Sequence, residues 1–429
     1  MSAPKENPAS RRRFLKSAAG GVVATGALAS FGVPAVATGA AREFKVGVVG
    51  CGGRGTGAAN NAREAAKLGG DTVTIHAVAD AFNDRAERAR RTNKVPKERT
   101  FVGVDAYHKL LELDLDYVIL ATPPYFRPQM IEAAVKSGKN VFTEKPVGVD
   151  APGIRRVLAA GESATKQGLS IAAGTQRRHQ KQYVECQKRV ADGAIGQLVT
   201  ARCYWNQGGL WSREKDPSWS DMEWQIRNWL YFTWLSGDHI VEQHVHNLDV
   251  TNWFMGSHPV AVRGMGGRQV RTGKAKYGNI FDHFATELIY KNPLGSGYPD
   301  IRAISMCRQI VACWNDVSEF VVGTTGSSNC RSQIWGPNAW QWKGKQVNPY
   351  VQEHIDLQAS IKEGKGSLNE AENVAHSTFT AILARTSCYT GKHLQWDKEL
   401  KDGATWGPQK FDLDTPIEIP PVPQVGKPM

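Results

Sequence analysis

Residues 45–55 read KVGVVGCGGRG, a short valine-rich run that leads directly into a glycine-rich turn. The alternating and β-branched residues before the turn are typical of a buried strand. A helix is expected to begin near Thr56, so the turn joins a strand to a helix. In such a turn Gly50 allows the tight bend, Gly52 lets the backbone approach a pyrophosphate, and Gly55 lets the helix pack closely on the strand.

The phosphates of a dinucleotide would lie at the N-terminus of this helix, where free N–H groups and the helix dipole favour anions. Gly53 belongs to the same turn, and Arg54 adds a positive charge at its edge. A tight turn that binds no nucleotide is the alternative interpretation of the stretch.

The next strand favours NAD as the nucleotide. Residues 73–79 form a second β-like run that ends in Asp80, and a helix-like segment follows at residues 83–91. An acid at this position suits the 2′-hydroxyl of an adenosine ribose and repels a 2′-phosphate. We therefore predict NAD rather than NADP, although four arginines close by weaken the preference: Arg85, Arg88, Arg90 and Arg91.

The N-terminus has the order of parts of a twin-arginine export signal. Residues 10–16 read SRRRFLK, and a mildly apolar segment at 18–33 leads to the small residues of PAVA at 34–37. We expect cleavage after Ala37 or near Ala41 and a periplasmic or exported protein. A basic tail without that role is the alternative. Twin-arginine export carries folded proteins, which suits an enzyme that binds its nucleotide before export.

Composition excludes several other classes. The chain has 429 residues, enough for two domains, and shows no apolar run of about 20 residues typical of a membrane span. Its formal charge of +12 falls by four without residues 1–40, and the remainder is spread along the chain, so no nucleic-acid surface is predicted. Seven cysteines without a CxxC pair predict no zinc framework and no particular disulfide.

The periodicity predicts two domains of different character. Strands alternate with helices up to about residue 168, which predicts an α/β Rossmann domain with a parallel sheet. An aromatic-rich stretch of strands follows, which predicts an α+β domain with an open, mostly antiparallel sheet and two closing helices. We expect a signal peptide at 1–41, the nucleotide-binding domain at 42–168, the second domain at 169–391 and an extended, proline-rich tail at 392–429.

Two segments carry the predicted chemistry. Lys145 follows a strand and precedes a proline, so its ammonium is expected to point into the crevice and take part in proton transfer. Residues 238–256 are predicted to form one helix with Glu242, His246 and Asp249 on one face. Acids at i−4 and i+3 would orient His246 as a general base. The alternatives are a helix with satisfied polar residues and a His244/His246 metal site, which the spacing of two disfavours.

The sequence resembles the Gfo/Idh/MocA family of oxidoreductases over residues 44–390. These motifs carry the resemblance: the turn at 50–55, Asp80, Thr122-Pro123, Glu144-Lys145-Pro146 and the helix of Glu242, His246 and Asp249. The resemblance implies NAD(P) held by these residues, Thr122, Pro123 and Glu144 among them. It also implies a sugar or cyclitol substrate, proton transfer by Lys145 and His246, and a homo-oligomer formed through the open sheet.

Two further residues are expected to contact the substrate. Arg178 lies in an arginine-bearing turn that matches the family. Trp205 belongs to a region crowded with aromatic residues and follows a strand that leads toward the cleft, where its ring could stack on a sugar. Glu242 and Asp249 would also contact the substrate. Glu242 stands where the family usually has Asp, which lengthens its reach by one methylene.

We therefore predict an exported NAD-dependent oxidoreductase that acts on a secondary hydroxyl of a sugar or sugar derivative. The leader resembles that of exported, glucose–fructose oxidoreductase-like members of the family, which keep their cofactor tightly bound. A redox-neutral glycoside hydrolase or lyase that uses bound NAD, as in the family's α-N-acetylgalactosaminidases, is the alternative. A sugar-binding protein without activity is disfavoured by the presence of both Lys145 and His246.

Overall fold

The computed structural model describes residues 41–408 and 411–427. The predicted export signal lies outside these residues. None of the helices in the described ranges is long and apolar enough to cross a membrane.

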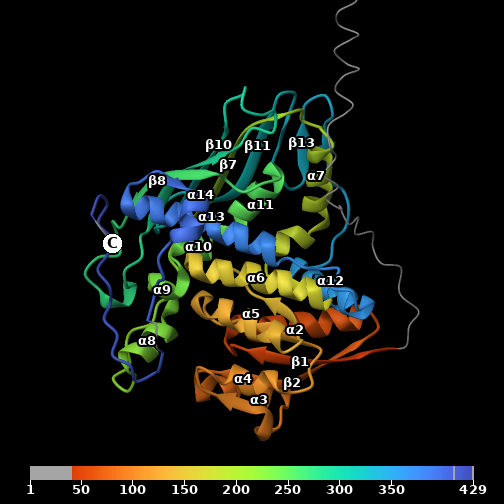
Figure 1. The fold of residues 1–429 in the computed structure, drawn as a ribbon, viewed down its shortest axis with the longest axis vertical. Helices are drawn as coiled ribbons and strands as arrows, with labels where there is room; N and C mark the ends of the chain where they lie inside the picture. Colours follow the sequence, from red (N-terminus) through yellow and green to blue (C-terminus); the bar gives the residue numbers. More distant parts are fainter. Residues whose placement is uncertain (1–40, 409–410, 428–429) are drawn as a thin grey trace, which may run out of the picture. The chain divides into compact units, whose positions relative to one another are not determined.

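The first part of the chain forms a six-stranded, wholly parallel sheet in the order β3-β2-β1-β4-β5-β6. Figure 1 labels β1 and β2 of this sheet. Its strands are β1 (Glu43–Val49), β2 (Thr72–Asp80), β3 (Thr100–Val102), β4 (Tyr117–Leu120), β5 (Asn140–Thr143) and β6 (Ile171–Ala173). The central strand β4 is buried along its whole length, as expected for a parallel sheet covered on both faces. The predicted Rossmann fold is confirmed.

Helices connect these strands in the right order for a doubly wound sheet. They are α2 (Gly53–Leu68), α3 (Asn83–Asn93), α4 (Tyr107–Leu111), α5 (Arg127–Lys136) and α6 (Ala151–Gln167), with short 3-10 turns η1 (Lys97–Arg99), η2 (Pro124–Phe126) and η3 (Gln176–His179). The side chain of Asp150 caps α6 by accepting a hydrogen bond from the N–H of Gly153, and Gly168 ends the helix in a left-handed conformation.

The second sheet has nine strands in the order β14-β13-β12-β11-β7-β10-β9-β8-β15. They are β7 (Leu198–Gln207), β8 (Ala261–Gly267), β9 (His283–Tyr290), β10 (Ile301–Gln309), β11 (Asp316–Gly323), β12 (Ser327–Ser328), β13 (Gln333–Trp335), β14 (Trp340–Gln341) and β15 (Leu394–Gln395). Only the pair β7 and β10 is parallel among these pairings. The predicted, mostly antiparallel sheet is confirmed.

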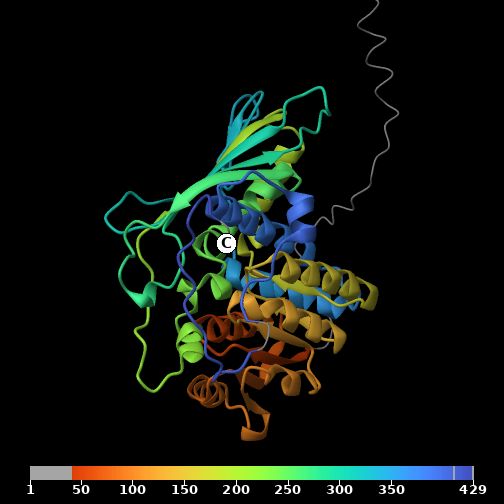
Figure 2. The ribbon, with the colours of Figure 1, turned by 60° about the vertical axis from the view of Figure 1, so that its left-hand side comes forward.

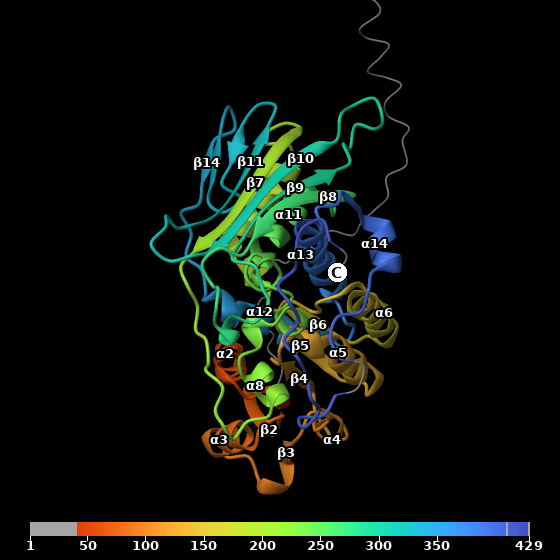
Figure 3. The ribbon, with the colours of Figure 1, turned by 90° about the vertical axis from the view of Figure 1, so that its left-hand side faces the viewer.

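The helices of the second part are α7 (Lys181–Ala191), α8 (Asp221–Arg227), α9 (Thr233–Ser236), α10 (His239–Glu242), α11 (Val245–Met255), α12 (Pro349–Glu363), α13 (Ala371–Thr390) and α14 (Trp396–Asp402), with 3-10 turns η4 (Trp229–Tyr231) and η5 (Ala275–Tyr277). Helix α11 packs on β7 and β11, and α13 packs on β8 and β9 (Figures 1 and 3). Helix α13 also contacts α6, and α12 contacts α2, so these two helices join the sheet domain to the nucleotide-binding domain.

Residues 411–427 form an extended C-terminal arm without helix or strand (Figure 2). The ring of Phe411 lies 5.1 Å from that of Phe126 in the first domain and 6.1 Å from that of Trp234 in the second. The hydroxyl of Ser220 donates to the carbonyl of Leu413 at 2.5 Å. The arm therefore contacts both domains.

Candidate active site

A cavity of about 660 Å³ lies at the carboxyl ends of β1, β2 and β4, where ligands of open parallel sheets bind. The first domain contributes the glycine turn, Asp80, Thr122 and Pro123. Five side chains come from the second domain: Trp211, Arg213, Ile226, Arg227 and Trp229. Sequence reasoning missed these five because the segment that carries them lies far from the glycine turn in the chain.

At two positions of the glycine turn there is no room for a side chain. Gly50 has φ of +88°, and a Cβ placed on it would lie 2.7 Å from the backbone of Ala121. A Cβ on Gly55 would overlap the carbonyl oxygen of Gly50. Gly53, by contrast, has nothing within 4 Å of a Cβ position. The first and third glycines therefore fix how closely α2 approaches β1.

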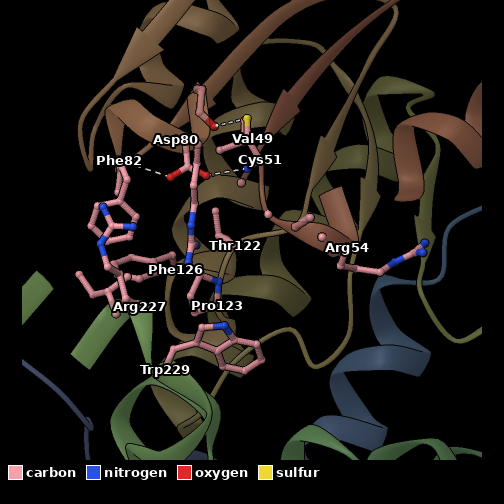
Figure 4. A pocket seen from close by; sticks show the side chains of 18 of the residues that line it. Val49, Cys51, Arg54, Asp80, Phe82, Thr122, Pro123, Phe126, Arg227 and Trp229 are labelled. Atoms are coloured by element: carbon pink, nitrogen blue, oxygen red, sulfur yellow. Dashed lines mark hydrogen bonds between the residues drawn. The ribbon is translucent and has the colours of Figure 1, made fainter. Parts of the chain in front are cut away.

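Asp80 holds this turn in place (Figure 4). Its Oδ2 accepts from the N–H of Cys51 at 2.7 Å, and its Oδ1 accepts from the N–H of Phe82 at 2.9 Å. Burial raises the pKa of the Asp80 carboxyl. Asp80 lines the cavity at the end of β2, where the predicted contact with a ribose would be made.

Arg54 lines the cavity, and its guanidinium is also engaged with carboxylates of the protein. Its guanidinium pairs with Glu144, lies 3.7 Å from the buried carboxylate of Glu353 and stands over the ring of Tyr350. Figure 4 shows the side chain extending away from Asp80. Two buried carboxylates need a nearby cation, and Arg54 supplies it. Glu144, predicted to contact the cofactor, is engaged in the same ion pair.

Lys145 follows β5, the neighbour of β4 in the first sheet. Its Nζ donates to the carbonyl oxygen of Glu242 at 2.6 Å and to Glu242 Oε1 at 3.0 Å. The side chain of Lys145 is 11 % exposed. The longer side chain of Glu242, noted in the sequence, thus lets one residue hold the ammonium with both its backbone and its carboxylate.

The prediction of a single helix over residues 238–256 is wrong. Helix α10 ends at Glu242, and α11 begins at Val245. The interruption leaves the carbonyl of Glu242 available to Lys145, whose ammonium replaces the N–H donor of a continuous helix. Glu242, before the break, and His246, after it, therefore do not belong to one continuous helix face.

His246 lies in the first turn of α11 and is 8 % exposed. Its ring stacks on that of Trp205 with 5.6 Å between centroids and 23° between planes. Burial, reinforced by the positive charges of Lys145 and Arg177, lowers the pKa of His246 well below its ordinary value. The imidazole is therefore neutral and able to accept a proton.

Asp249 and Arg178 were predicted to serve His246 and the substrate, but they pair with each other. The Nε of Arg178 donates to both carboxylate oxygens of Asp249, at 3.0 and 2.9 Å, and the hydroxyl of Ser377 donates to Oδ1 at 2.7 Å. The carboxylate of Asp249 thus faces η3 and α13. The substrate contacts of Arg178 and Asp249 stay predictions.

Arg177, which sequence reasoning missed, lies between Glu319 and the ring of Trp205. It pairs with Glu319 on β11 and lies over the ring of Trp205, with 5.6 Å from Cζ to the centroid. Asn247 also donates to Glu319, at 2.6 Å, so this carboxylate links Arg177 to the first turn of α11. The sequence carries no signal that distinguishes the contacts of these two adjacent arginines.

His244 and His246, the alternative metal ligands, have separate surroundings. His244 Nε2 lies 2.8 Å from the hydroxyl of Ser305, beneath the second sheet, and does not share a ligand set with His246. No group of three His, Cys, Asp or Glu side chains suited to a metal ion occurs in residues 41–408 and 411–427.

Comparison with known proteins shows the family. The Gfo/Idh/MocA oxidoreductase family, described as having an NAD-binding Rossmann fold, matches residues 44–172, and the GFO/IDH/MocA C-terminal domain matches residues 183–328. The two regions together take up well over half of the chain. The chain belongs to the Gfo/Idh/MocA oxidoreductase family.

Similar curated proteins act on inositols. Inositol 2-dehydrogenase of Rhizobium meliloti is 27 % identical over 208 residues, covering 48 % of this chain and 55 % of that protein. The scyllo-inositol 2-dehydrogenase (NAD(+)) of Bacillus subtilis is 24 % identical over 250 residues, covering 58 % of this chain and 64 % of that protein. The chain thus matches little more than half the length of these relatives.

Solved structures share the fold over most of the chain. Aldose-aldose oxidoreductase from Caulobacter crescentus, complexed with glycerol, is 18 % identical with a TM-score of 0.63, covering 82 % of this chain and 100 % of that one. The myo-inositol 2-dehydrogenase from Lactobacillus plantarum is 20 % identical with a TM-score of 0.62, covering 82 % of this chain and 99 % of that one.

Proposed function

We propose that the protein is an NAD-dependent oxidoreductase that acts on a secondary hydroxyl of a sugar or cyclitol. The observation that carries this proposal is the position of the Lys145 ammonium. It is held by Glu242 beside the neutral imidazole of His246, at the end of the strand next to the cavity. The sequence of the leader further supports export of the protein.

The cavity fits a dinucleotide. Gly52 and Gly53 line the cavity, and no protein atom lies closer than 4.0 Å to a Cβ position on either residue, so a pyrophosphate can approach their backbone. Asp80 lies at the adenosine end of such a ligand. The residues that would hold NAD are the glycine turn, Asp80, Thr122 and Pro123. When bound, the nicotinamide supplies the hydride acceptor or donor of the reaction.

Lys145 and His246 divide the proton chemistry between them. The neutral imidazole of His246 accepts the proton of the substrate hydroxyl in the oxidative direction. The ammonium of Lys145 donates a hydrogen bond to the same oxygen and stabilises the negative charge that develops there. Glu242 orients the ammonium, and the stack on Trp205 orients the imidazole.

A panel of inositols and aldoses tests this proposal, with NADH formation as the readout. Lys145→Ala and His246→Ala should each lower kcat by on the order of 10²–10⁴-fold, as expected for loss of a general acid or base. Both variants should keep their affinity for NAD. Lys136→Ala, on the exposed surface of α5, is the matched control and should keep full activity. Near-full turnover by either site variant would refute the assigned roles.

One relative favours a second candidate, a redox-neutral reaction that uses bound NAD transiently. The 2,7-anhydro-N-acetylneuraminate hydratase of Escherichia coli is 26 % identical over 189 residues, covering 44 % of this chain and 46 % of that protein. A test with glycosides separates the two candidates. Release of reducing sugar without net NADH would support the second, and stoichiometric NADH would support the first.

A further inference from the structure

Three arginines and two aromatic rings line the same cavity as the glycine turn and Asp80. Phe82 has the guanidinium of Arg227 at 3.8 Å from its ring centroid and that of Arg85 at 5.2 Å. The guanidinium of Arg213 stands over the ring of Trp211 at 5.7 Å. Arg85 belongs to the first domain and the other two to the second, so cations from both domains meet here (Figure 4 shows Arg227 on Phe82).

These arginines differ in how their charges are balanced. Arg227 pairs with Asp84 and Glu223, both at 2.8 Å. For Arg85 and Arg213, no side-chain hydrogen bond or ion pair occurs within the part of the chain that the structure describes. The carboxylate of Asp80 attracts Arg85, but its two oxygens already accept from backbone N–H groups.

Such an arrangement is costly without an anion. Burial lowers the pKa of the Arg85 guanidinium, and repulsion from Arg227 and Arg213 lowers it further. The negative charge of Asp80 offsets part of this decrease. Like charges in a partly desolvated site destabilise one another, and a bound anion removes this cost. The described residues therefore supply too little negative charge to balance these arginines, and an anion bound in the cavity would supply the rest.

The position of Arg85 indicates which anion. Its Nη1 lies 4.0 Å from the Cβ position of Gly52, the residue that precedes the first turn of α2. The backbone N–H groups of that turn form the phosphate cradle of the fold. Arg54, the cation that the sequence places at this edge, is engaged with Glu144 and Glu353.

We propose that Arg85 and Arg213 bind the pyrophosphate of the dinucleotide, so that the second domain supplies one of its two cations. The inference rests on the proposed function, because it requires a dinucleotide in the cavity. Arg213 would then contribute to the affinity for the nucleotide, and residues 211–229 would form the part of the binding site that the second domain supplies.

Calorimetric titration of the mature chain with ADP-ribose, and separately with adenosine, tests the proposal. Arg85→Gln and Arg213→Gln should each raise the Kd for ADP-ribose by about tenfold or more, since a charge-assisted contact with phosphate is lost. The Kd for adenosine, which has no phosphate, should change less than about twofold by the same reasoning. Arg91→Gln, an exposed position on α3 with the same change of charge, should leave both values unchanged.

Three results would overturn the inference. Equal losses for ADP-ribose and adenosine would mean that the arginines only support the fold of the pocket. An effect confined to NADP⁺, with ADP-ribose unaffected, would mean that they bind a 2′-phosphate. If the unaltered protein bound neither ADP-ribose nor NAD⁺, the proposed function itself would fail, whereas binding that is insensitive to Arg213→Gln would refute this inference alone.

Discussion

Replacing Arg227 with alanine should speed the release of bound nucleotide. Arg227 lies on α8 and holds residues 211–229 to the first domain through Phe82 and Asp84. A cation over an aromatic ring at 3.8 Å, with the arginine side chain 12 % exposed, is worth about 1–2 kcal/mol. The pair with Asp84, whose side chain is 54 % exposed, adds about 0.5 kcal/mol. Glu223 lies on the same helix as Arg227 and contributes nothing to this link.

The loss of about 2 kcal/mol raises the equilibrium constant for detachment of residues 211–229 from the first domain by about 30-fold. If this detachment precedes release, nucleotide dissociates about 30-fold faster from Arg227→Ala, by the same relation. Stopped-flow displacement of NADH by excess ADP-ribose measures this rate. Arg263→Ala, which removes an exposed ion pair with Glu287 on the second sheet, is the control. A rate for Arg227→Ala within twofold of the control would refute the role of this contact in nucleotide release.

Three further predictions concern the site. His246→Gln should lose turnover while keeping NAD affinity, as measured by activity and by titration. Arg177→Met removes a cation that lowers the pKa of His246, so the acid limb of kcat/KM should move to higher pH; Arg178→Met, whose partner is Asp249, should leave it unmoved. Gly55→Ala should abolish ADP-ribose binding or lower the melting temperature, because its Cβ meets backbone, whereas Gly53→Ala should be tolerated.

The sign of the pH effect follows from the direction of the pKa shift. Because the pKa of His246 is lowered in the folded protein, its neutral form persists below the ordinary histidine range. Activity that depends on the neutral imidazole should therefore survive to pH values below about 6, until the folded pKa is reached. An acid limb at the ordinary histidine pKa in the unaltered protein would contradict the assignment of His246 as a buried base.

Local patterns were enough to predict the two sheets and the residues that end their strands. Asp80 ends β2 and Lys145 follows β5, and parallel strands bring their carboxyl ends to one edge of the sheet. The alternation of exposed and buried residues in β10 likewise predicts a sheet with one covered face. These features depend on periodicity, which residues close in sequence determine.

The choice of ion-pair partners could not be predicted in this way. Arg54 and Arg178 sit in the motifs where a ligand-binding cation is expected, yet each pairs with a carboxylate of the protein. Their partners Glu353 and Asp249 come from α12 and α11, far away in the chain. The break between α10 and α11 could not be predicted for a related reason. Lys145, which belongs to the other domain, stabilises the break by donating to the carbonyl of Glu242.

The position of the C-terminal arm in the chain determines when its contact with the two domains can form. Domains fold during synthesis in the order in which they leave the ribosome. Phe411, which packs on both Phe126 and Trp234, is synthesised after every strand of the two sheets. The aromatic contact by which the arm links the two domains can therefore form only once the residues of both sheets have already been made.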